Sequence, residues 1–207
     1  MIKNKLNYKF LLLAKISFIY ILLCLNSFSD DSTLKNNLIV LGQNDAPVKI
    51  KIFSSLTCPH CADFHIKVVP KIIKDYVQIG KVQLIFLDFP LDVAALNASK
   101  LLHCLNREKQ LKFMDTIYEN QGSWTSGSNL NDINDNLKKL VKELGITPKK
   151  FEKCLNNENI ENTILNNRIE GQKKYSINST PTIIINEKKF NGSYDFKGMK
   201  KKIDKLI

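Results

Sequence analysis

Hydrophobic and polar residues alternate along residues 48–53, which read VKIKIF. A period of two is typical of a half-buried β-strand. Serines and a threonine interrupt the pattern in residues 54–57, and hydrophobic residues then recur at helical spacing, at Phe64, Val68, Ile72 and Tyr76. The pattern therefore predicts a strand, a short turn and a helix that begins close to residue 58.

The rest of the chain is predicted to form a second strand, a run of helices, a hairpin and a closing helix. A continuous hydrophobic run indicates a strand from Val82 to Phe89, and Pro90 ends it. Helical periodicity indicates helices over about 93–105, 108–120, 137–144 and 160–175, with another that opens at Thr147-Pro148 and a loop over 121–128. A hairpin over 182–190 and an amphipathic helix over 196–207 follow. We therefore expect an α/β domain over 48–207, with a helical insertion at about 93–175.

The first 29 residues have the pattern of a secretory signal peptide. Lys3, Lys5 and Lys9 form a basic start, residues 16–25 form a hydrophobic run that is too short to cross a bilayer, and small residues stand just before position 30. We expect cleavage after residue 29, which leaves residues 30–47 as a lead-in segment. A retained membrane anchor is the alternative, although Lys15 interrupts the hydrophobic part. A lipoprotein signal at Cys24 is disfavoured, because the residue before it is the large Leu23.

Removal of the signal leaves 178 residues and lowers the formal charge from +11 to +7, because the segment holds four lysines and no acidic residue. A chain of this length can form one domain with a sizeable core. The lysines are spread along the chain and do not gather with aromatic residues. A solvated basic surface therefore explains them better than a nucleic-acid binding site, and we expect no nucleic-acid partner.

The sequence Cys58-Pro59-His60-Cys61 stands where the first strand gives way to a helix. Free N–H groups at a helix start, the helix dipole and a neighbouring imidazole all stabilise negative charge on sulfur. Cys58 is therefore expected to be the thiolate nucleophile, with Cys61 one turn deeper as the resolving thiol. A zinc site is the alternative for a CxxC motif, but tetrahedral zinc needs about four ligands and the motif supplies two.

Four cysteines remain after signal cleavage, and an even number in an exported protein favours two pairs. With Cys58 and Cys61 as one pair, the simplest second pair joins Cys104 to Cys154. Such a structural disulfide would close a loop of about 50 residues and stabilise the fold by about 4 kcal/mol in the chain-entropy model. A buried pair of free thiols and a second redox couple are the alternatives.

Ser179-Thr180-Pro181 immediately precedes the late strand. A proline at the entrance to a core strand gives up a backbone donor, so its position requires a reason. A cis Thr180-Pro181 bond that turns the chain back beside the dithiol would be one, whereas a trans proline is commoner at a strand start. The upstream CxxC motif favours the cis form.

These segments together resemble the DsbA-type thiol:disulfide oxidoreductases of bacterial envelopes. The resemblance covers most of residues 40–207 and depends on the CPHC sequence, the helical insertion and a Thr-Pro pair ahead of a hairpin. It implies a thioredoxin fold in which Cys58 is the nucleophile and Cys61 its buried partner. It also implies that Pro181 is a clamp beside them and that Thr180 lends backbone hydrogen bonds to a bound peptide.

The resemblance further implies an activity, a location and partners. The protein would introduce disulfide bonds into unfolded exported proteins with free cysteines, in the periplasm, and a DsbB-like membrane oxidase would reoxidise it. We expect a monomer that needs no metal or other cofactor. The oxidising direction also has a physical reason, because groups such as His60 that stabilise the Cys58 thiolate stabilise the reduced enzyme and make its disulfide a strong oxidant.

Three residues near the cysteines qualify this picture. Thioredoxin-like proteins often have a buried acid six residues before the first cysteine, and Ile52 stands there in this chain. The proton relay assigned to that acid is therefore in doubt, while the missing negative charge should favour the thiolate. For His65 and His103 we expect solvent-facing or packing positions rather than metal binding.

Two other functions stay open on the sequence alone. A disulfide isomerase is favoured by Thr180, since isomerases of this superfamily often have threonine before the cis-proline. The lead-in segment of about 18 residues is, however, short for the module through which those isomerases oligomerise. A metal carrier would bind copper or zinc through Cys58, Cys61 and His60.

Overall fold

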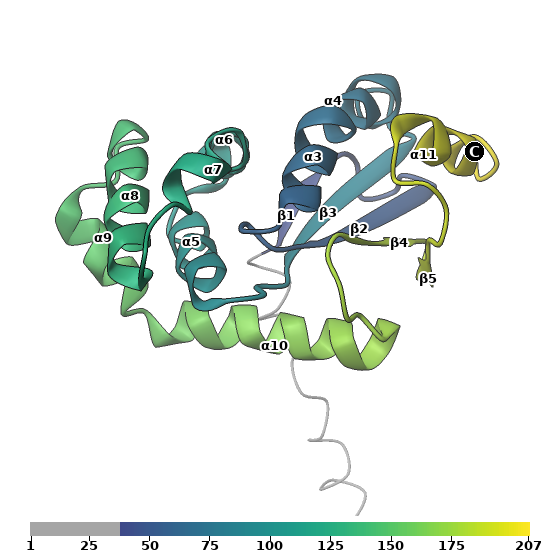
Figure 1. Ribbon diagram of the computed structural model, residues 1–207. Coiled ribbons are helices and arrows are strands. Elements are labelled where there is room, and N and C mark those ends of the chain that lie inside the picture. Colours follow the sequence, from purple (N-terminus) through teal and green to yellow (C-terminus); the bar gives the residue numbers. More distant parts are fainter. Residues whose placement is uncertain (1–37) are drawn as a thin grey trace, which may run out of the picture. The chain divides into compact units, whose positions relative to one another are not determined.

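The computed structural model describes residues 38–207, drawn in colour in Figure 1. The predicted signal peptide, residues 1–29, and residues 30–37 of the predicted lead-in segment lie outside the described residues. In the described part of the chain, no helix is both long enough and hydrophobic enough to span a bilayer.

A five-stranded mixed sheet forms the centre of the described domain, with its strands in the order β1-β3-β2-β4-β5. The strands are β1 (Ile39–Leu41), β2 (Val48–Ser54), β3 (Val82–Asp88), β4 (Thr182–Ile185) and β5 (Lys188–Lys189). β2 and β3 are parallel, whereas β4 pairs antiparallel with the other edge of β2. Phe53, near the end of β2, therefore lies opposite Thr182, the first residue of β4.

The sequence pattern does not predict β1 and leaves its residues in the lead-in segment 30–47. In the structure, Ile39–Leu41 pairs antiparallel with β3, and Ile39 is buried. A strand of three residues is too short to show a period of two, so its pairing with β3 is what identifies it. The sheet therefore begins before residue 48.

Helices flank the sheet and fill the long segment between β3 and β4 (Figure 1). The group that follows β2 consists of α3 (Pro59–Lys67), α4 (Val69–Ile72) and a π-helical turn, η2 (Ile73–Val77). The segment between β3 and β4 contains α5 (Val93–His103), α6 (Arg107–Glu119), α7 (Gln121–Trp124), α8 (Leu130–Glu143), α9 (Pro148–Leu155) and α10 (Glu158–Tyr175), and α11 (Phe196–Ile203) follows β5. The short α7 lies within the predicted loop over 121–128. The α/β fold expected from the sequence, with helices inserted before the closing hairpin, is confirmed.

Polar side chains set where many of these helices begin. An N-cap oxygen that accepts a backbone N–H of the first turn stabilises a helix by about 1 kcal/mol. Asp92 makes this contact before α5, Asn129 before α8, Thr147 before α9, Asn157 before α10 and Asp195 before α11. Cys58 is the N-cap residue of α3, but its side chain makes no capping hydrogen bond.

The two faces of the sheet carry different hydrophobic clusters. Ile50 and Ile52 of β2 belong to the main core, on the face covered by α3, α4 and α11 (Figure 1). Phe53 points to the opposite face and joins a smaller cluster on the side of α10. Helix α10 approaches this face so closely at Gly171 that a Cβ atom there would lie 2.6 Å from a ring carbon of Phe53. The helix thus crosses the sheet and delivers the chain to the segment that precedes β4.

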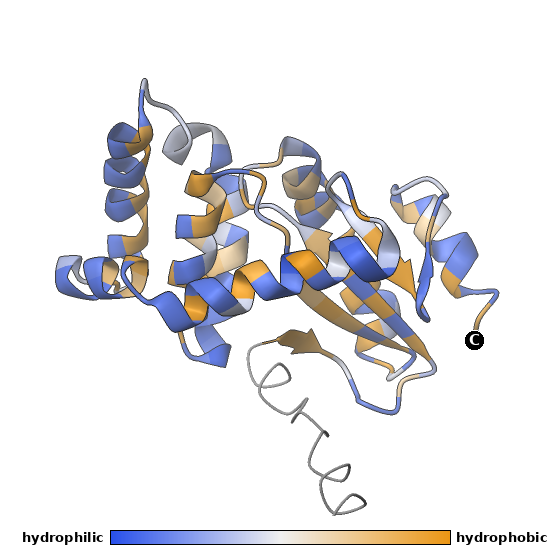
Figure 2. Cartoon of the chain, turned by 90° about the horizontal axis from the view of Figure 1, so that it is seen from below, coloured by the Kyte–Doolittle hydropathy of each residue, from blue (hydrophilic) through white to orange (hydrophobic). Residues whose placement is uncertain are grey.

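The helical insertion continues the main core. Figure 2 shows α8 with hydrophobic residues on one side and hydrophilic residues on the other. Its buried residues, Leu137 and Val141, belong to the same cluster as Trp124 of α7, which is 1% exposed. Both α8 and α9 pack on α5. Residues of the insertion therefore share one hydrophobic interior with the helices that cover the sheet.

Candidate active site

The two cysteines of the CPHC motif lie at the start of α3. The carbonyl of Cys58 accepts the backbone N–H groups of Cys61 and Ala62, at 3.0 and 3.1 Å, so Cys61 lies within the first turn. Cys58 is 7% exposed and Cys61 is 1% exposed, and neither is in a disulfide. Pro59 and His60, between them, are exposed. Of the two sulfur-bearing residues, Cys58 is therefore the more accessible.

The backbone at this helix start favours negative charge on the Cys58 sulfur. Pro59 has no N–H, and the N–H groups of Cys61 and Ala62 are used by the Cys58 carbonyl. The N–H of His60 stands at a position from which an N-cap side chain commonly accepts a hydrogen bond. The positive end of the helix dipole acts in the same direction. Cys58 therefore lies where the first turn of α3 presents its backbone donors.

The turn between β2 and α3 is tied to the helical insertion through one carboxylate. The hydroxyl of Thr57 donates to Oδ2 of Asp92 at 2.7 Å, and Ser55 Oγ lies 3.1 Å from Thr57 Oγ1. The other oxygen of Asp92 accepts the N–H of Ala95 at 2.7 Å and so caps α5. Asp92 therefore links the active-site turn to the first helix of the insertion.

Thr180 and Pro181 lie beside Cys58, although Thr180 is 122 residues away in the sequence. The Cys58 thiol donates to the carbonyl oxygen of Thr180, with 3.3 Å between Sγ and O, and the Thr180-Pro181 peptide bond is cis. The pairing of β2 with β4 explains the proximity, because β4 begins next to the end of β2. The structure thus brings together Cys58, Pro59, His60, Cys61, Thr180 and Pro181.

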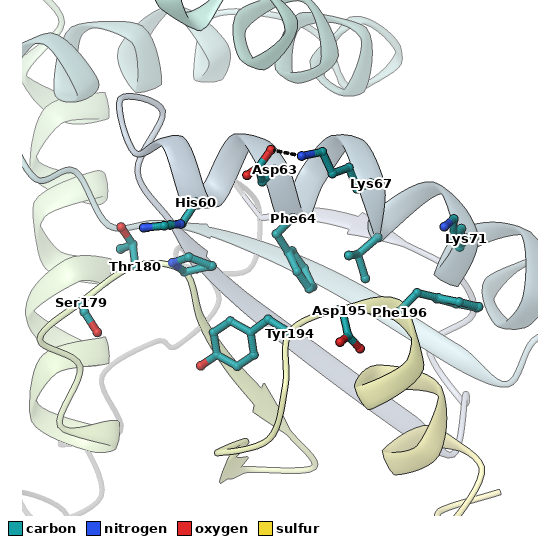
Figure 3. Close-up of a pocket in the computed structure, with 12 residues that line it drawn as sticks. His60, Asp63, Phe64, Lys67, Lys71, Ser179, Thr180, Tyr194, Asp195 and Phe196 are labelled. Atoms are coloured by element: carbon teal, nitrogen blue, oxygen red, sulfur yellow. Dashed lines mark ion pairs between the residues drawn. The ribbon is translucent and has the colours of Figure 1, made fainter.

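An open groove of about 610 Å³ runs from His60 and Thr180 along α3 towards the start of α11 (Figure 3). Aromatic rings line it. Phe64 meets Tyr194 edge-on, with 6.2 Å between the ring centroids, and Phe196 lies further along. The groove therefore begins at residues that neighbour the dithiol, His60 and Thr180, and its far part is lined in part by aromatic rings.

Charged groups at the groove are largely paired within the protein. Lys67 Nζ lies 2.6 Å from Asp63 Oδ1, one turn away on α3. Lys71 Nζ lies 5.6 Å from the ring centroid of Phe196, and Asp195 accepts the N–H of Gly198 to cap α11. The groove lining thus has two lysines and two aspartates, so their formal charges balance.

Burial raises the pKa of the Cys61 thiol to about 12. The neighbouring Cys58 contributes to the rise, while the nearby polar groups of Thr180 and Ser55 oppose it. Cys61 is therefore a protonated thiol at neutral pH when the pair is reduced. The two cysteines of the motif have different chemistry, since one lies at a charge-stabilising helix start and the other in the core.

The two histidines outside the motif pack inside the domain, each beside a carboxylate. His65 Nε2 lies 2.7 Å from Asp115 Oδ1, and His103 Nε2 is hydrogen-bonded to Asp88. The side chains of His103 and Asp88 are 7% and 10% exposed. Burial alone would raise the pKa of Asp88 and lower that of His103, but their mutual attraction prevails, so the pKa of Asp88 is lowered and that of His103 is raised.

Cys104 and Cys154 do not take part in this site. They form a disulfide between the C-cap of α5 and the last turn of α9, with their Cα atoms 6.0 Å apart. Cys154 is 1% exposed. Helix α5 therefore starts at the active-site turn, where Asp92 caps it, and ends at the disulfide.

One contact of the active-site turn was not predicted from the sequence. The side-chain amide of Gln121 donates to the carbonyl oxygens of Leu56 and Cys58, at 2.8 and 3.2 Å. The sequence pattern places Gln121 in a loop. No pattern could have revealed this contact, because its acceptors are backbone atoms that every residue possesses.

This arrangement can exchange electrons through sulfur. A disulfide between Cys58 and Cys61 could be attacked at the more accessible Cys58, and the protein would release Cys61 as the leaving group. In residues 38–207, no three His, Cys, Asp or Glu side chains gather closely enough to hold a metal ion.

Comparisons with known proteins agree with this chemistry. The family model described as thioredoxin matches residues 34–205. A Bacillus cereus relative named probable disulfide bond formation protein D is 31% identical over 174 residues, which cover 81% of this chain and 77% of the relative. A Rickettsia bellii relative, named as a protein-disulfide oxidoreductase, is 26% identical, and the match covers 84% of this chain and 66% of the relative.

Solved structures show the same likeness in three dimensions. The crystal structure of Wolbachia pipientis α-DsbA1 superposes with a TM-score of 0.75 at 32% identity, over 82% of this chain and 90% of that one. BdbD from Bacillus subtilis, in its oxidised form, superposes with a TM-score of 0.71 at 25% identity, over 83% and 93% of the two chains. The chain therefore belongs to the thioredoxin family, as a DsbA-type thiol:disulfide oxidoreductase.

Proposed function

We propose that this protein is an oxidase that introduces disulfide bonds into exported proteins, with Cys58 as the nucleophile and Cys61 as its resolving partner. The observation that carries the proposal is the position of Cys58. It lies at the N-cap of α3, 3.3 Å from the Thr180 carbonyl, at the end of an apolar groove. The helix start would favour the thiolate, against the opposing effect of the Thr180 carbonyl oxygen, and the adjoining groove gives a second chain a route to Cys58.

The proposed reaction moves two electrons from a substrate dithiol to the enzyme disulfide. A substrate thiolate attacks Cys58 Sγ, the Cys58–Cys61 bond breaks, and a mixed disulfide forms while Cys61 leaves with the electron pair. A second substrate thiolate then attacks the substrate sulfur of the mixed disulfide. Cys58 leaves as a thiolate, the substrate disulfide is complete, and the enzyme is reduced.

The two sulfur atoms leave the reaction in different protonation states. Burial raises the pKa of Cys61 to about 12, so this leaving group must take up a proton, which one of the substrate thiols has released. Cys58 keeps its charge, since the helix start stabilises it. His60, exposed beside Cys58, adds the positive charge or dipole of its imidazole, which we propose as its catalytic contribution. Stabilisation of the reduced form makes the disulfide strongly oxidising.

We assign substrate binding to Thr180 and Pro181 together with the groove. Thr180 lies next to Cys58 and can offer its backbone to an extended peptide, while Pro181 holds the chain against the dithiol. The aromatic residues of the groove provide apolar contact without demanding one side-chain sequence. This favours unfolded polypeptides with free cysteines as the substrate class.

We further propose that the protein acts in the periplasm as a monomer and is reoxidised by a DsbB-like membrane oxidase. The signal-peptide pattern expected over residues 1–29 supports the location. The names of the relatives, which include disulfide bond formation protein D, support the oxidising role. We assign the disulfide between Cys104 and Cys154 a structural role, because it joins two packed helices of the insertion.

The reduction potential of the Cys58–Cys61 pair tests the proposal. Equilibration with glutathione buffers should give a value near the oxidising end of the superfamily, roughly −120 mV, as for DsbA. A value near that of thioredoxin, roughly −270 mV, would contradict an oxidase and favour a reductant. Incubation with a reduced test protein should yield its native disulfides at the expense of the enzyme disulfide.

A disulfide isomerase is the second candidate, since threonine precedes the cis proline. An oxidase consumes one enzyme disulfide for each substrate disulfide formed, whereas an isomerase acts on a scrambled substrate without net oxidation. We expect the reduced enzyme to leave a scrambled test protein largely unrepaired. Rapid repair by the reduced enzyme would favour the isomerase.

A further inference from the structure

A buried glutamine of the helical insertion contacts the turn that carries Cys58. Gln121, the first residue of α7, is 9% exposed and lies 63 residues from Cys58 in the sequence. Its Nε2 donates to the carbonyl oxygen of Leu56 at 2.8 Å and to that of Cys58 at 3.2 Å. One amide group therefore bridges the carbonyls on either side of Thr57, immediately before α3.

The carbonyl of Cys58 receives three donors in this arrangement. Besides the Gln121 amide, it accepts the backbone N–H groups of Cys61 and Ala62, at 3.0 and 3.1 Å. Hydrogen bonds from several directions restrict the orientation of the peptide plane to which the carbonyl belongs. Leu56 is 3% exposed, so its carbonyl would have to find another partner in the interior if the amide were removed.

The short helix that carries Gln121 is itself anchored in the core. Trp124 is 1% exposed and donates its indole N–H to the carbonyl of Ile117 at 2.9 Å. The hydroxyl of Thr125 donates to the carbonyl of Gln121 at 2.6 Å. The Gln121 side chain therefore reaches the active-site turn from a fixed base.

We propose that Gln121 is a positioning residue for the thiol:disulfide exchange at Cys58. The Gln121 amide fixes the orientation of the Cys58 carbonyl, and so holds the Cys58 sulfur at the start of α3. The positive end of the Gln121 amide dipole also points towards the turn between β2 and α3. Both effects favour the Cys58 thiolate and therefore the reduced enzyme. This assignment rests on the proposed role of Cys58 as the nucleophile, and it makes the helical insertion part of the redox machinery.

The chain contains a matched glutamine that serves as the control. Gln110 of α6 is 6% exposed, and its Nε2 donates to the carbonyls of Leu102 and Leu105, at 3.4 and 3.3 Å. Both acceptors belong to the insertion and neither belongs to the active-site turn. Substitution of Gln110 also removes a buried side-chain amide that donates to two carbonyls. It therefore measures the loss of unfolding free energy without any change at the active-site turn.

The test compares Gln121→Glu and Gln121→Met with Gln110→Glu and Gln110→Met in the full-length chain. The readouts are the ultraviolet absorbance of the thiolate titrated against pH, the equilibrium of the Cys58–Cys61 pair with glutathione, and unfolding by denaturant. All four variants should unfold more easily than the parent. The Gln121 variants alone should raise the pH at which the thiolate appears and shift the glutathione equilibrium towards the enzyme disulfide. We expect the equilibrium constant with glutathione to shift about tenfold in Gln121→Glu, whose charge repels the thiolate, and about threefold in Gln121→Met.

Equal redox equilibria for the Gln121 and Gln110 variants would overturn the assignment and leave Gln121 as a packing residue. Gln121→Asn gives a milder test if the larger changes do not fold, because it keeps the amide and shortens its reach by one methylene. It should shift the equilibrium in the same direction by about twofold, and no shift would count against the role. If the parent protein did not oxidise a reduced substrate but the Gln121 variants still moved the equilibrium, the proposed function would fail while the positioning role stood.

Discussion

The two cysteine pairs of this domain lie in different surroundings. Cys58 and Cys61 share the first turn of α3, are not bonded to each other, and adjoin a groove lined by aromatic rings. Cys104 and Cys154 come from two helices, 50 residues apart in the sequence, and are joined in a disulfide. Both pairs belong to the main hydrophobic core or pack against it.

The difference lies in what surrounds the sulfur atoms. At Cys58, the helix start favours negative charge and a neighbouring carbonyl accepts the thiol hydrogen. In the second pair, Cys154 is 1% exposed in the interior of packed helices, and its half-buried partner Cys104 lies at the C-terminal end of α5, away from a charge-stabilising helix start. The surroundings of Cys58 and Cys61 favour thiol–disulfide exchange, whereas those of Cys104 and Cys154 favour a permanent structural disulfide, although the side chains are the same.

Replacement of Cys58 tests the comparison with the largest expected effect. Cys58→Ala should reduce disulfide formation in a reduced test protein to the uncatalysed rate, because it removes the sulfur that we propose accepts the substrate thiolate. The matched control is the double variant Cys104→Ala with Cys154→Ala, which should retain turnover. Catalysis by Cys58→Ala would show that the second pair exchanges with substrates.

Removal of the second pair should mainly affect stability. The double variant Cys104→Ala with Cys154→Ala should lose about 4 kcal/mol of unfolding free energy, because the closed loop of 50 residues is no longer constrained in the unfolded chain. Denaturant unfolding of the oxidised parent and the double variant measures this loss. A loss well below 1 kcal/mol would mean that helix packing alone holds α5 against α9.

A buried ion pair lies close to the structural disulfide, and its effect should depend on pH. Asp88→Asn leaves His103 buried without its carboxylate and should cost about 3 kcal/mol where His103 is protonated. The folded pKa of Asp88 is lowered, so its contribution is present above its ordinary value of 3.8 and is lost as pH falls through the folded pKa. The folded pKa of His103 is raised, so its contribution is present below 6.5 and is lost as pH rises through the folded pKa.

The cost of Asp88→Asn should therefore be largest between about pH 4 and pH 6.5 and should decrease in more alkaline solution. Unfolding curves of the parent and the variant across this range give the comparison. A cost that does not vary with pH would indicate that His103 is neutral in the folded protein.

Replacement of His60 should change redox behaviour with little change in stability. His60→Leu removes an exposed imidazole beside Cys58, so the unfolding free energy should change by no more than about 0.5 kcal/mol. The glutathione equilibrium should shift towards the enzyme disulfide by about tenfold, since the thiolate loses a stabilising group. An unchanged equilibrium would assign the stabilisation of the thiolate to the helix start alone.

Much of the fold was predictable from hydrophobic periodicity. β2, β3, α5, α6 and α10 were expected close to their observed ranges, because a pattern repeated over seven or more residues is recognisable. The start of α8 was wrong, since the helix begins at Leu130 and the expected range was 137–144; its first two turns are mostly polar and are capped by Asn129. β1 and α7 have three and four residues and show no period. Each is held by a long-range contact, β1 by pairing with β3 and α7 by the burial of Trp124.

The sequence by itself determined the nature of the chemistry. Two cysteines separated by Pro59-His60 at a strand-to-helix junction specify a dithiol at a helix start, because the junction is local and the helix dipole acts over its first turn. The tertiary structure decided what meets that dithiol. Thr180 reaches Cys58 through the pairing of β2 with β4, and Gln121 reaches it from a helix anchored by the core. The proximity of Thr180-Pro181 to the dithiol was expected from the sequence, but the Gln121 contact was not, because its acceptors are backbone atoms that carry no sequence signature and only the folded chain brings them together.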